Sequence, residues 1–358
     1  MLQETFWQGK KVLITGHTGF KGSWLCIWLH TLGARVTGYA LAPPSQPNLF
    51  ESCGIHSLVE SVTADVRDLH RLSDVVAQTR PEIIIHMAAQ SLVRESYDAP
   101  VETYDTNVMG TVNLLEAVRK TPGVKAVINV TSDKCYENIE TLKGYHENKT
   151  LGGHDPYSNS KACSELVTRA FRSSFFHPDR YNTHGVALAT ARAGNVIGGG
   201  DWATDRLVPD CIRAMLKKET ILLRFPQAVR PWQHVLEPLR GYLMLAEKLY
   251  LSGPQFSGAW NFGPAEEDTR TVLSVVKKLC VTWGAPEGYA LMDGNHPHEA
   301  GLLKLDCSKA RERLGFNPYW HIDIALEKVV AWAKARERGE DMLAFSQRQI
   351  AQYQEEGH

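Results

Sequence analysis

Tyr157 and Lys161 are the residues whose types and spacing are best suited to acid–base chemistry. Four positions apart on a helix, two side chains lie one turn apart on the same face. Pro156 fits the first turn of such a helix. An ammonium beside a phenol favours the phenolate, so we expect the pKa of Tyr157 to fall from about 10 toward neutrality, as a general base for alcohol oxidation requires. A surface tyrosine and a solvated lysine at chance spacing are the alternative.

A glycine motif lies between a predicted strand and a predicted helix near the start of the chain. Residues 11–15 form a short apolar run typical of a buried parallel strand, and G-x-x-G-x-x-G follows directly. Glycines at such a turn let the backbone approach a pyrophosphate at a helix N-terminus. The motif therefore predicts dinucleotide binding. The predicted contacts are Gly16, Thr18, Gly19, Phe20 and Gly22.

The next two predicted strands, residues 35–41 and 58–62, leave the identity of the dinucleotide open. An acidic residue at the end of the second strand binds the ribose of NAD, and a basic residue accommodates NADP. Residues 39–44 carry no charge, so neither cofactor is favoured. After the third strand we expect the Asp65 carboxylate to accept from the exocyclic amine of adenine. Capping a helix is the alternative role, and Asp68 fits that role better.

Three more apolar runs, residues 81–90, 126–130 and 184–190, complete an alternating strand and helix pattern. The first ends in Ala88 and Ala89, whose small side chains would let a cofactor lie flat on the chain. The pattern predicts an α/β fold, a Rossmann doubly wound parallel sheet of six or seven strands with a smaller, mostly C-terminal α/β substrate lobe.

The chemistry is expected at the carboxyl ends of these strands, where the fifth strand leads into residues 131–136. A long helix is predicted at residues 104–119. We assign residues 1–200 to a cofactor-binding domain that carries the catalytic residues. Residues 201–358 are assigned mainly to the substrate-binding lobe, with some elements returning to the first domain.

Charge and composition argue against several classes of partner. The 39 Lys and Arg residues balance 40 Asp and Glu residues, and no basic run is present, so nucleic acid and anionic membranes are not expected as partners. The longest apolar stretches are far shorter than the roughly 20 residues that span a bilayer. Seven scattered cysteines without C-x-x-C indicate reduced thiols, with neither a disulfide framework nor a metal site. With no apolar signal region evident, we expect a soluble, cytoplasmic protein.

The order of these motifs, with Ser132 between the alanines and Tyr157, resembles that of the extended short-chain dehydrogenases/reductases over nearly the whole chain. Within that group the chain is similar to the nucleotide-sugar 4,6-dehydratases through residues 16–22, 131–136 and 198–202. The likeness is greatest to members that act on CDP-glucose. It implies NAD as cofactor, CDP-glucose as substrate, and a homodimer or dimer of dimers packed through helices that include the Tyr157 helix.

The resemblance also implies roles for individual residues in a three-step reaction. Tyr157 takes the C4 hydroxyl proton while a hydride passes from C4 to NAD, and Ser132 hydrogen-bonds the same hydroxyl. A base then removes the acidified C5 proton, Asp133 protonates the departing C6 hydroxyl, and the hydride returns to C6. Asp133 needs a raised pKa to be protonated. The implied cofactor contacts further include Val66, Thr106, Tyr157 and Lys161.

Lys134 occupies the position where the commoner dehydratase pattern has a glutamate as the C5 base. A lysine with the ordinary pKa of about 10.4 is protonated near pH 7, and only the neutral amine accepts a proton. Lys161 and a dry site would lower the pKa of Lys134, whereas Asp133 would raise it. We favour Lys134 as the base. Alternatively its ammonium stabilises the enolate while water or Tyr157 moves the proton.

Three residues are assigned to the substrate. Asn195 matches a family position near the sugar and diphosphate, and Arg206 and Arg230 are chosen as phosphate contacts because guanidinium binds phosphate with two hydrogen bonds. A surface ion pair is the alternative role of Arg206. No role is assigned to the residues where relatives carry a nucleotide-side arginine and histidine, and their spacing fits no zinc site. These residues are His296, His298 and Glu299.

Two other functions are compatible with parts of this pattern. A nucleotide-sugar 4-epimerase needs Ser132, Tyr157 and Lys161 but no acid and base for C5 and C6, so Asp133 and Lys134 favour a dehydratase. A non-catalytic dinucleotide-binding protein on the same fold is the other alternative, since a fold does not determine a function. The intact catalytic residues make it the weaker interpretation.

Overall fold

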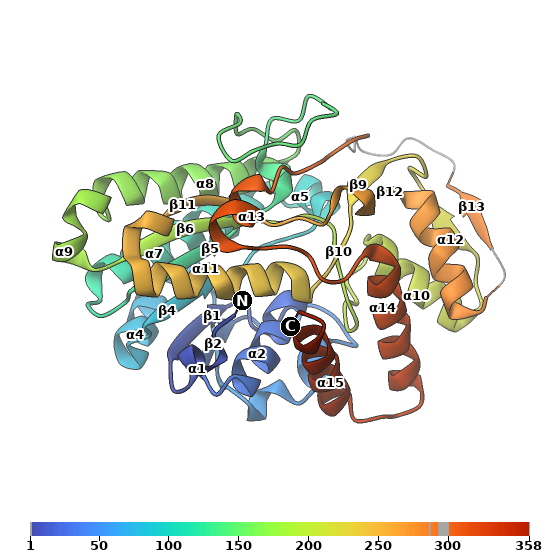
Figure 1. Ribbon diagram of the computed structural model, residues 1–358, viewed down its shortest axis with the longest axis horizontal. Helices are drawn as coiled ribbons and strands as arrows, with labels where there is room; N and C mark the ends of the chain where they lie inside the picture. Colours follow the sequence, from blue (N-terminus) through green and yellow to red (C-terminus); the bar gives the residue numbers. More distant parts are fainter. Residues whose placement is uncertain (1, 286–287, 293–300, 358) are drawn as a thin grey trace.

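The computed structural model describes residues 2–285, 288–292 and 301–357 (Figure 1). Within these residues, seven parallel strands form a central sheet in the order β11-β6-β5-β4-β1-β2-β3. The order reverses between β1 and β4, as in a doubly wound α/β sheet, and the predicted fold class is confirmed. The strands are β1 (Lys11–Thr15), β2 (Arg35–Ala40), β3 (Glu60–Thr63), β4 (Ile83–His86), β5 (Ala126–Val130), β6 (Ala187–Arg192) and β11 (Gly258–Asn261).

The central strands are buried on both faces because helices cover the sheet on both sides (Figure 1). Alternate residues of each strand point to opposite faces, so Ile83 and Ile85 belong to one apolar core and Ile84 to another. Helices α4, α7 and α8 supply the core that contains Ile84, and α2 and α11 supply the other. The bounds are α2 (Phe20–Thr31), α4 (Leu69–Thr79), α7 (Gly110–Lys120), α8 (Pro156–Ser174) and α11 (Leu236–Ser252).

The strand register brings the carboxyl ends of neighbouring strands to one edge. Thr15 pairs with His86, His86 with Asn129, and Val130 with Ala191. The segments that follow β1, β4, β5 and β6 therefore lie side by side. This edge is where a doubly wound sheet binds its ligands.

The second half of the chain contributes both to the sheet and to a separate lobe. Strand β11 pairs with β6, and α15 (Met342–Glu355) packs on α2, so segments beyond residue 200 return to the sheet. The lobe has its own apolar core, which includes Ile212, Leu223 and Val276. Its elements are α10 (Leu207–Lys217), β8 (Ile221–Leu223), β9 (Val229–Pro231), β12 (Thr269–Thr271), α12 (Val272–Trp283), β13 (Tyr289–Leu291) and α14 (Ile322–Glu337).

The helix predicted at residues 104–119 is interrupted. Helix α6 (Pro100–Tyr104) is followed by a π-helical turn, Asp105–Met109, and only then by α7. Such turns insert an extra residue and are frequent at functional sites. The remaining shorter elements are α1 (Glu4–Trp7), α3 (Leu49–Ser52), α5 (Val93–Asp98), α9 (Tyr181–His184), β7 (Val196–Ile197), β10 (Gln233–His234) and α13 (Ser308–Leu314).

Two limits of this architecture bear on function. In the part of the chain that the structure describes, no helix combines the length and apolar character needed to cross a bilayer. The same residues include no group of three or more His, Cys, Asp or Glu side chains that could hold a metal ion.

Candidate active site

Tyr157 and Lys161 lie in the first two turns of α8, which begins at Pro156 as predicted. The Asp155 carboxylate caps the helix by accepting from the Ser158 amide at 2.9 Å. Both side chains are buried, Tyr157 being 9% and Lys161 5% exposed, and both line a cavity of about 620 Å³. The chance-spacing alternative, which needs a solvated pair, does not describe these residues.

The pKa of Tyr157 differs from the prediction. Burial raises it to about 12, and the hydrogen bond with Ser132 opposes that rise. The Lys161 ammonium donates to the Val130 carbonyl at 3.4 Å, and its own pKa is lowered to about 8 by burial. The expected fall of the Tyr157 pKa was wrong because residue spacing reveals neither the desolvation of the phenol nor the partner of the amine.

Ser132, Asp133 and Lys134 come one residue after the end of β5 and line the same cavity. The Ser132 hydroxyl donates to Asp133 at 3.0 Å and accepts from the Lys134 amide at 3.2 Å, which holds the turn Asp133–Cys135. Lys134 is half-buried, and its role as the base stays a prediction.

Asp133 has the environment that a proton donor needs. Its side chain is buried, and that burial raises the pKa of its carboxyl, with the Lys134 charge acting in the opposite direction. Among the described residues, its Oδ2 has no hydrogen-bond partner. A side chain at position 194 would overlap this carboxylate, so Gly194 leaves the room that Asp133 occupies. Asp133 is therefore buried beside the cavity, and none of the described residues hydrogen-bonds to one of its oxygens.

The glycine loop fits a dinucleotide. Gly16 follows β1 with φ +77°, and a Cβ there would lie 2.7 Å from the Ala88 amide nitrogen, so only glycine allows this close approach. Gly19 caps α2, Phe20 is its first residue, and Gly22 lies in its first turn. With bare backbone at a helix N-terminus, this loop can hold a pyrophosphate.

The other predicted cofactor contacts lie on several segments. The Thr18 hydroxyl donates to the Leu41 carbonyl at 2.9 Å and joins the loop to the end of β2. Ala88 donates its amide to Thr15 at 3.1 Å, and Ala89 lines the cavity. Thr106 is half-buried in the π-helical turn.

Asp65 and Asp68 take different positions after β3. Asp65 accepts from the Arg67 amide at 2.9 Å and its guanidinium at 2.6 Å, so its contact with adenine stays a prediction. Asp68 caps α4 by accepting from the Arg71 amide, which is the role expected for it. Val66 is buried between them.

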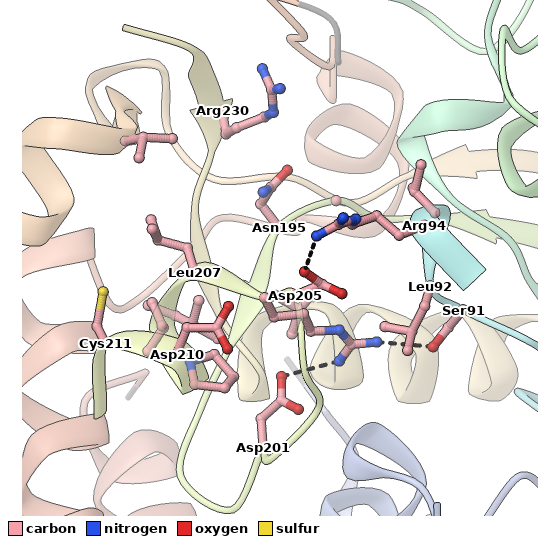
Figure 2. A pocket seen from close by; sticks show the side chains of 18 of the residues that line it. Ser91, Leu92, Arg94, Asn195, Asp201, Asp205, Leu207, Asp210, Cys211 and Arg230 are labelled. Carbon is pink, nitrogen blue, oxygen red and sulfur yellow. Dashed lines mark hydrogen bonds and ion pairs between the residues drawn. The ribbon is translucent and has the colours of Figure 1, made fainter. Parts of the chain in front are cut away.

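Asn195, Arg206 and Arg230 line the cavity. Figure 2 labels Asn195 and Arg230. Arg206 donates to Asp201 at 3.0 Å and to Ser91 at 2.9 Å, so the ion pair considered as an alternative exists within the cavity wall. Arg230 is buried and donates to the Val229 carbonyl at 3.0 Å. Substrate contacts of these three stay predictions. The residues to which no role was assigned, His296, His298 and Glu299, lie outside the described residues.

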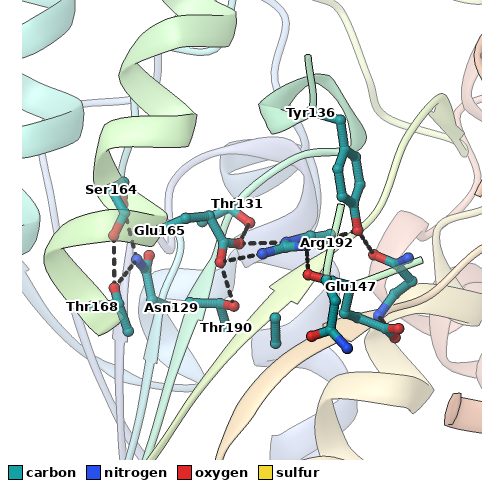
Figure 3. Close-up of polar contacts among 12 residues, drawn as sticks. Asn129, Thr131, Tyr136, Glu147, Ser164, Glu165, Thr168, Thr190 and Arg192 are labelled. Carbon is teal, nitrogen blue, oxygen red and sulfur yellow. Dashed lines mark hydrogen bonds and ion pairs between the residues drawn. The ribbon is translucent and has the colours of Figure 1, made fainter. Parts of the chain in front are cut away.

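A buried charge network lies beneath the catalytic turn (Figure 3). Glu165 accepts from the Arg192 guanidinium at 2.8 and 2.9 Å, from Thr131 at 2.5 Å and from Thr190 at 2.7 Å. Arg192 also donates to the Tyr136 hydroxyl at 2.7 Å. Both charged side chains are 3% exposed. We call these five residues the floor network, and it joins α8 to the ends of β5 and β6.

The floor network and two further residues near the cavity were missed by the sequence analysis. Lys21 lines the cavity, and its pKa is lowered to about 7 by burial and by the nearby Lys161 charge. Asn107, in the π-helical turn, donates to the Gln90 carbonyl at 2.9 Å and the Ser160 hydroxyl at 2.8 Å. A lysine inside the glycine motif was an available signal, whereas nothing in the local sequence indicates the Asn107 contacts.

Comparison with known proteins identifies the family of this chain. The sequence matches the family described as GDP-mannose 4,6 dehydratase over residues 13–329. It is 55% identical to the CDP-glucose 4,6-dehydratase of Salmonella typhimurium strain LT2, over 99% of this chain and 98% of that protein.

Solved structures of similar fold include dehydratases and epimerases. A dTDP-glucose 4,6-dehydratase from Streptomyces venezuelae with NAD bound has a TM-score of 0.77 at 24% identity, covering 93% of this chain and 99% of that one. A UDP-glucose 4-epimerase from Thermotoga maritima with UDP-glucose has a TM-score of 0.78 at 22% identity, covering 91% and 99%. These likenesses show the fold.

Proposed function

The chain belongs to the GDP-mannose 4,6 dehydratase family, and on that premise we propose that it is an NAD-dependent CDP-glucose 4,6-dehydratase. It converts CDP-glucose to CDP-4-dehydro-6-deoxyglucose and water. The observation that carries this function is the placement of Asp133, with its raised pKa, in the same cavity as Tyr157 and Ser132. Oxidation at C4 needs only the last two, whereas loss of water from C6 needs a proton donor as well.

The first step is oxidation at C4. Tyr157 must be ionised to accept the proton of the C4 hydroxyl, and burial opposes that ionisation by raising its pKa to about 12. Ser132, which hydrogen-bonds the phenol, holds the C4 hydroxyl in place. Ser132 and Arg206 both lower the pKa of Tyr157 against the effect of burial. Bound NAD supplies the hydride acceptor for this step and the hydride donor for the last one. The glycine loop, with Gly16 at its start, would hold its pyrophosphate.

The second step is elimination across C5 and C6. The C4 ketone makes the C5 hydrogen acidic, and Lys134 removes it as a neutral amine. Asp133 donates its proton to the C6 oxygen, which leaves as water. Burial raises the pKa of the Asp133 carboxyl and so favours the protonated form that general acid catalysis requires. The hydride held by bound NAD would then return to C6 and C5 would regain a proton, so the cofactor would end each turnover oxidised.

Turnover of a panel of substrates tests the proposed function. The full chain is incubated with CDP-, dTDP-, UDP- and GDP-glucose, and products are analysed for a 4-keto-6-deoxyhexose. We expect product from CDP-glucose, with no NADH accumulating in proportion to it. Stoichiometric NADH would identify a simple dehydrogenase, conversion to the galactose epimer would identify an epimerase, and no turnover of any of the four would overturn the dehydratase assignment.

The role of Lys134 is tested by two substitutions. If the neutral amine is the base, Lys134→Met still oxidises C4 but stalls before water leaves, and exchange of the C5 hydrogen with deuterated solvent falls with product formation. Lys134→Arg keeps the charge but cannot accept the proton. An arginine variant that remains active and exchanges C5 would show that water or Tyr157 moves the proton.

We further propose a cytoplasmic homo-oligomer, either a dimer or a dimer of dimers. Helices α5, α6 and α8 pack against one another and carry exposed apolar side chains, which support an interface between copies of the chain. These side chains include Tyr97, Val101 and Leu166. Sedimentation of the wild type and of Val101→Lys/Leu166→Lys tests this, and a monomeric wild type would contradict it.

A further inference from the structure

At the mouth of the active-site cavity, one carboxylate lies between two arginines. Asp205 Oδ1 accepts from Arg94 at 2.9 Å and from Arg224 at 3.2 Å (Figure 2 shows the first contact). Arg94 belongs to α5, whereas Arg224 follows β8 in the second lobe. All three residues line the cavity, so the carboxylate links its two sides. We call these residues the mouth clamp.

The charges of the mouth clamp do not balance. Two guanidinium groups share one carboxylate oxygen, which leaves a net charge of about +1 on the three side chains at neutral pH. The neighbouring Arg206 already has its own carboxylate partner, Asp201. Unlike that pair, the mouth clamp carries excess positive charge, which suits it to bind an anion with more charge than a single carboxylate.

The mouth clamp can also change partners at low cost. The side chains of Arg94, Asp205 and Arg224 are 44%, 38% and 18% exposed, so solvent reaches each of them. If an anion took both arginines, the Asp205 carboxylate would turn to water and no buried unpaired charge would remain. Exposed ion pairs contribute little free energy, so opening this one opposes binding only weakly.

The position of the mouth clamp along the cavity suits the middle of the substrate. The hexose must place C4 at Tyr157 and Ser132, and its diphosphate must extend away from them toward the mouth. The cavity wall there carries Arg94, Arg206 and Arg224. A guanidinium binds phosphate oxygens with two parallel hydrogen bonds. The charge of a diphosphate also complements two guanidinium groups better than the charge of one carboxylate does.

Building on the proposed function, we propose that Arg94 and Arg224 bind the substrate diphosphate and that Asp205 occupies them until substrate displaces it. Asp205 then acts as an internal competitor that keeps the two arginines paired and correctly placed. The affinity for a nucleoside diphosphate is set by the arginines and reduced by the aspartate.

Calorimetric titration of the full chain with CDP and with cytidine tests the mouth clamp. Arg94→Gln and Arg224→Gln should each weaken CDP binding by about 10- to 100-fold, because each removes a charged hydrogen bond to phosphate. Their affinity for cytidine should equal that of the wild type. Asp205→Asn should strengthen CDP binding by about 2- to 5-fold, and asparagine is also suited to the left-handed backbone at this position, where φ is +59°.

Two controls make the result specific. Arg119→Gln removes an arginine of similar exposure from an ion pair remote from the cavity and should leave CDP affinity unchanged. In the Arg94→Gln/Arg224→Gln background, Asp205→Asn should no longer strengthen binding, because the competitor has lost its partners. CDP binding unchanged by both arginine substitutions would overturn this inference while leaving the proposed function intact. A wild type that binds none of CDP, UDP, GDP and dTDP would overturn both.

Discussion

The floor network and the mouth clamp use the same chemistry in opposite surroundings. In the floor network, Glu165 and Arg192 are 3% exposed and their charges are fully hydrogen-bonded by fixed partners. In the mouth clamp, Arg94 and Asp205 are 44% and 38% exposed, and one oxygen serves two arginines. A buried pair cannot exchange partners without leaving a charge in a medium of low dielectric constant, whereas an exposed pair can.

The two regions therefore serve different purposes. The floor network joins α8 to the strand ends that carry Thr131 and Arg192, and so fixes the helix of Tyr157 relative to the Ser132 turn. The mouth clamp lies on the cavity wall, where the proposed substrate would enter. The floor network is rigid because it is buried, and the mouth clamp can exchange partners because it is exposed, although both pair arginine with an acid.

The largest effect on the reaction rate is expected at Tyr157, whose helix is fixed by the floor network. Tyr157→Phe should lower the rate of C4 oxidation by about 10²–10⁴-fold, because it removes the proposed general base. The ring still packs, so the thermal midpoint of unfolding and NAD binding should remain close to wild type. Single-turnover measurement of NADH formation with CDP-glucose, alongside thermal unfolding, checks both. An unchanged rate would remove Tyr157 from the chemistry.

The next effect concerns the stability of the floor network itself. Glu165→Gln leaves Arg192 buried without its counter-charge and should lower the free energy of unfolding by about 3–5 kcal/mol. Denaturant unfolding measures it. Glu116→Gln breaks an exposed ion pair with Arg119 and should cost only a small fraction of that amount. Equal losses in the two variants would show that burial does not distinguish these pairs.

The loss of folding stability at acidic pH should come from buried histidines and not from the mouth clamp. Burial lowers the pKa of His86 and His234 to about 3 and that of His17 to about 4. The unfolded chain takes up protons on these side chains below about pH 6.5, whereas the folded chain does not. Their contribution to stability is therefore present above about pH 6.5 and is lost as pH falls toward 4 and 3.

Denaturant unfolding at pH 7, 6, 5 and 4 checks this prediction. Replacing His86 with glutamine should reduce the slope of unfolding free energy against pH, at some cost in stability at pH 7. His177→Gln is the control, because its side chain is 43% exposed. A His86 variant with the wild-type slope would contradict the buried-histidine explanation.

The smallest effect on stability is expected at the mouth clamp. Asp205→Asn should change the free energy of unfolding by less than about 1 kcal/mol, since exposed ion pairs rarely contribute more. Raising the salt concentration should diminish even that difference. A loss comparable to that of Glu165→Gln would show that Asp205 is structural and would remove the contrast between the two regions.

The sequence by itself determined the fold class and which of the predicted residues would share one cavity. The apolar run before Gly16 and the helical spacing after Pro156 are local patterns, and parallel strands order their carboxyl ends in a known way. Lys11–Thr15 and Ala126–Val130 are strands with the predicted bounds, and α8 starts where it was predicted to start. Ser132, Asp133, Tyr157 and Lys161 line one cavity because of the same strand order and helical spacing.

Only the tertiary structure decided the protonation chemistry and the charge partners. The spacing of Tyr157 and Lys161 predicted a lowered phenol pKa, but burial raises it to about 12. Glu165 and Arg192 are 27 positions apart, and Arg94 and Asp205 are 111 positions apart. Desolvation and long-range ion pairs depend on which distant segments the fold brings together, so no local pattern could have predicted them.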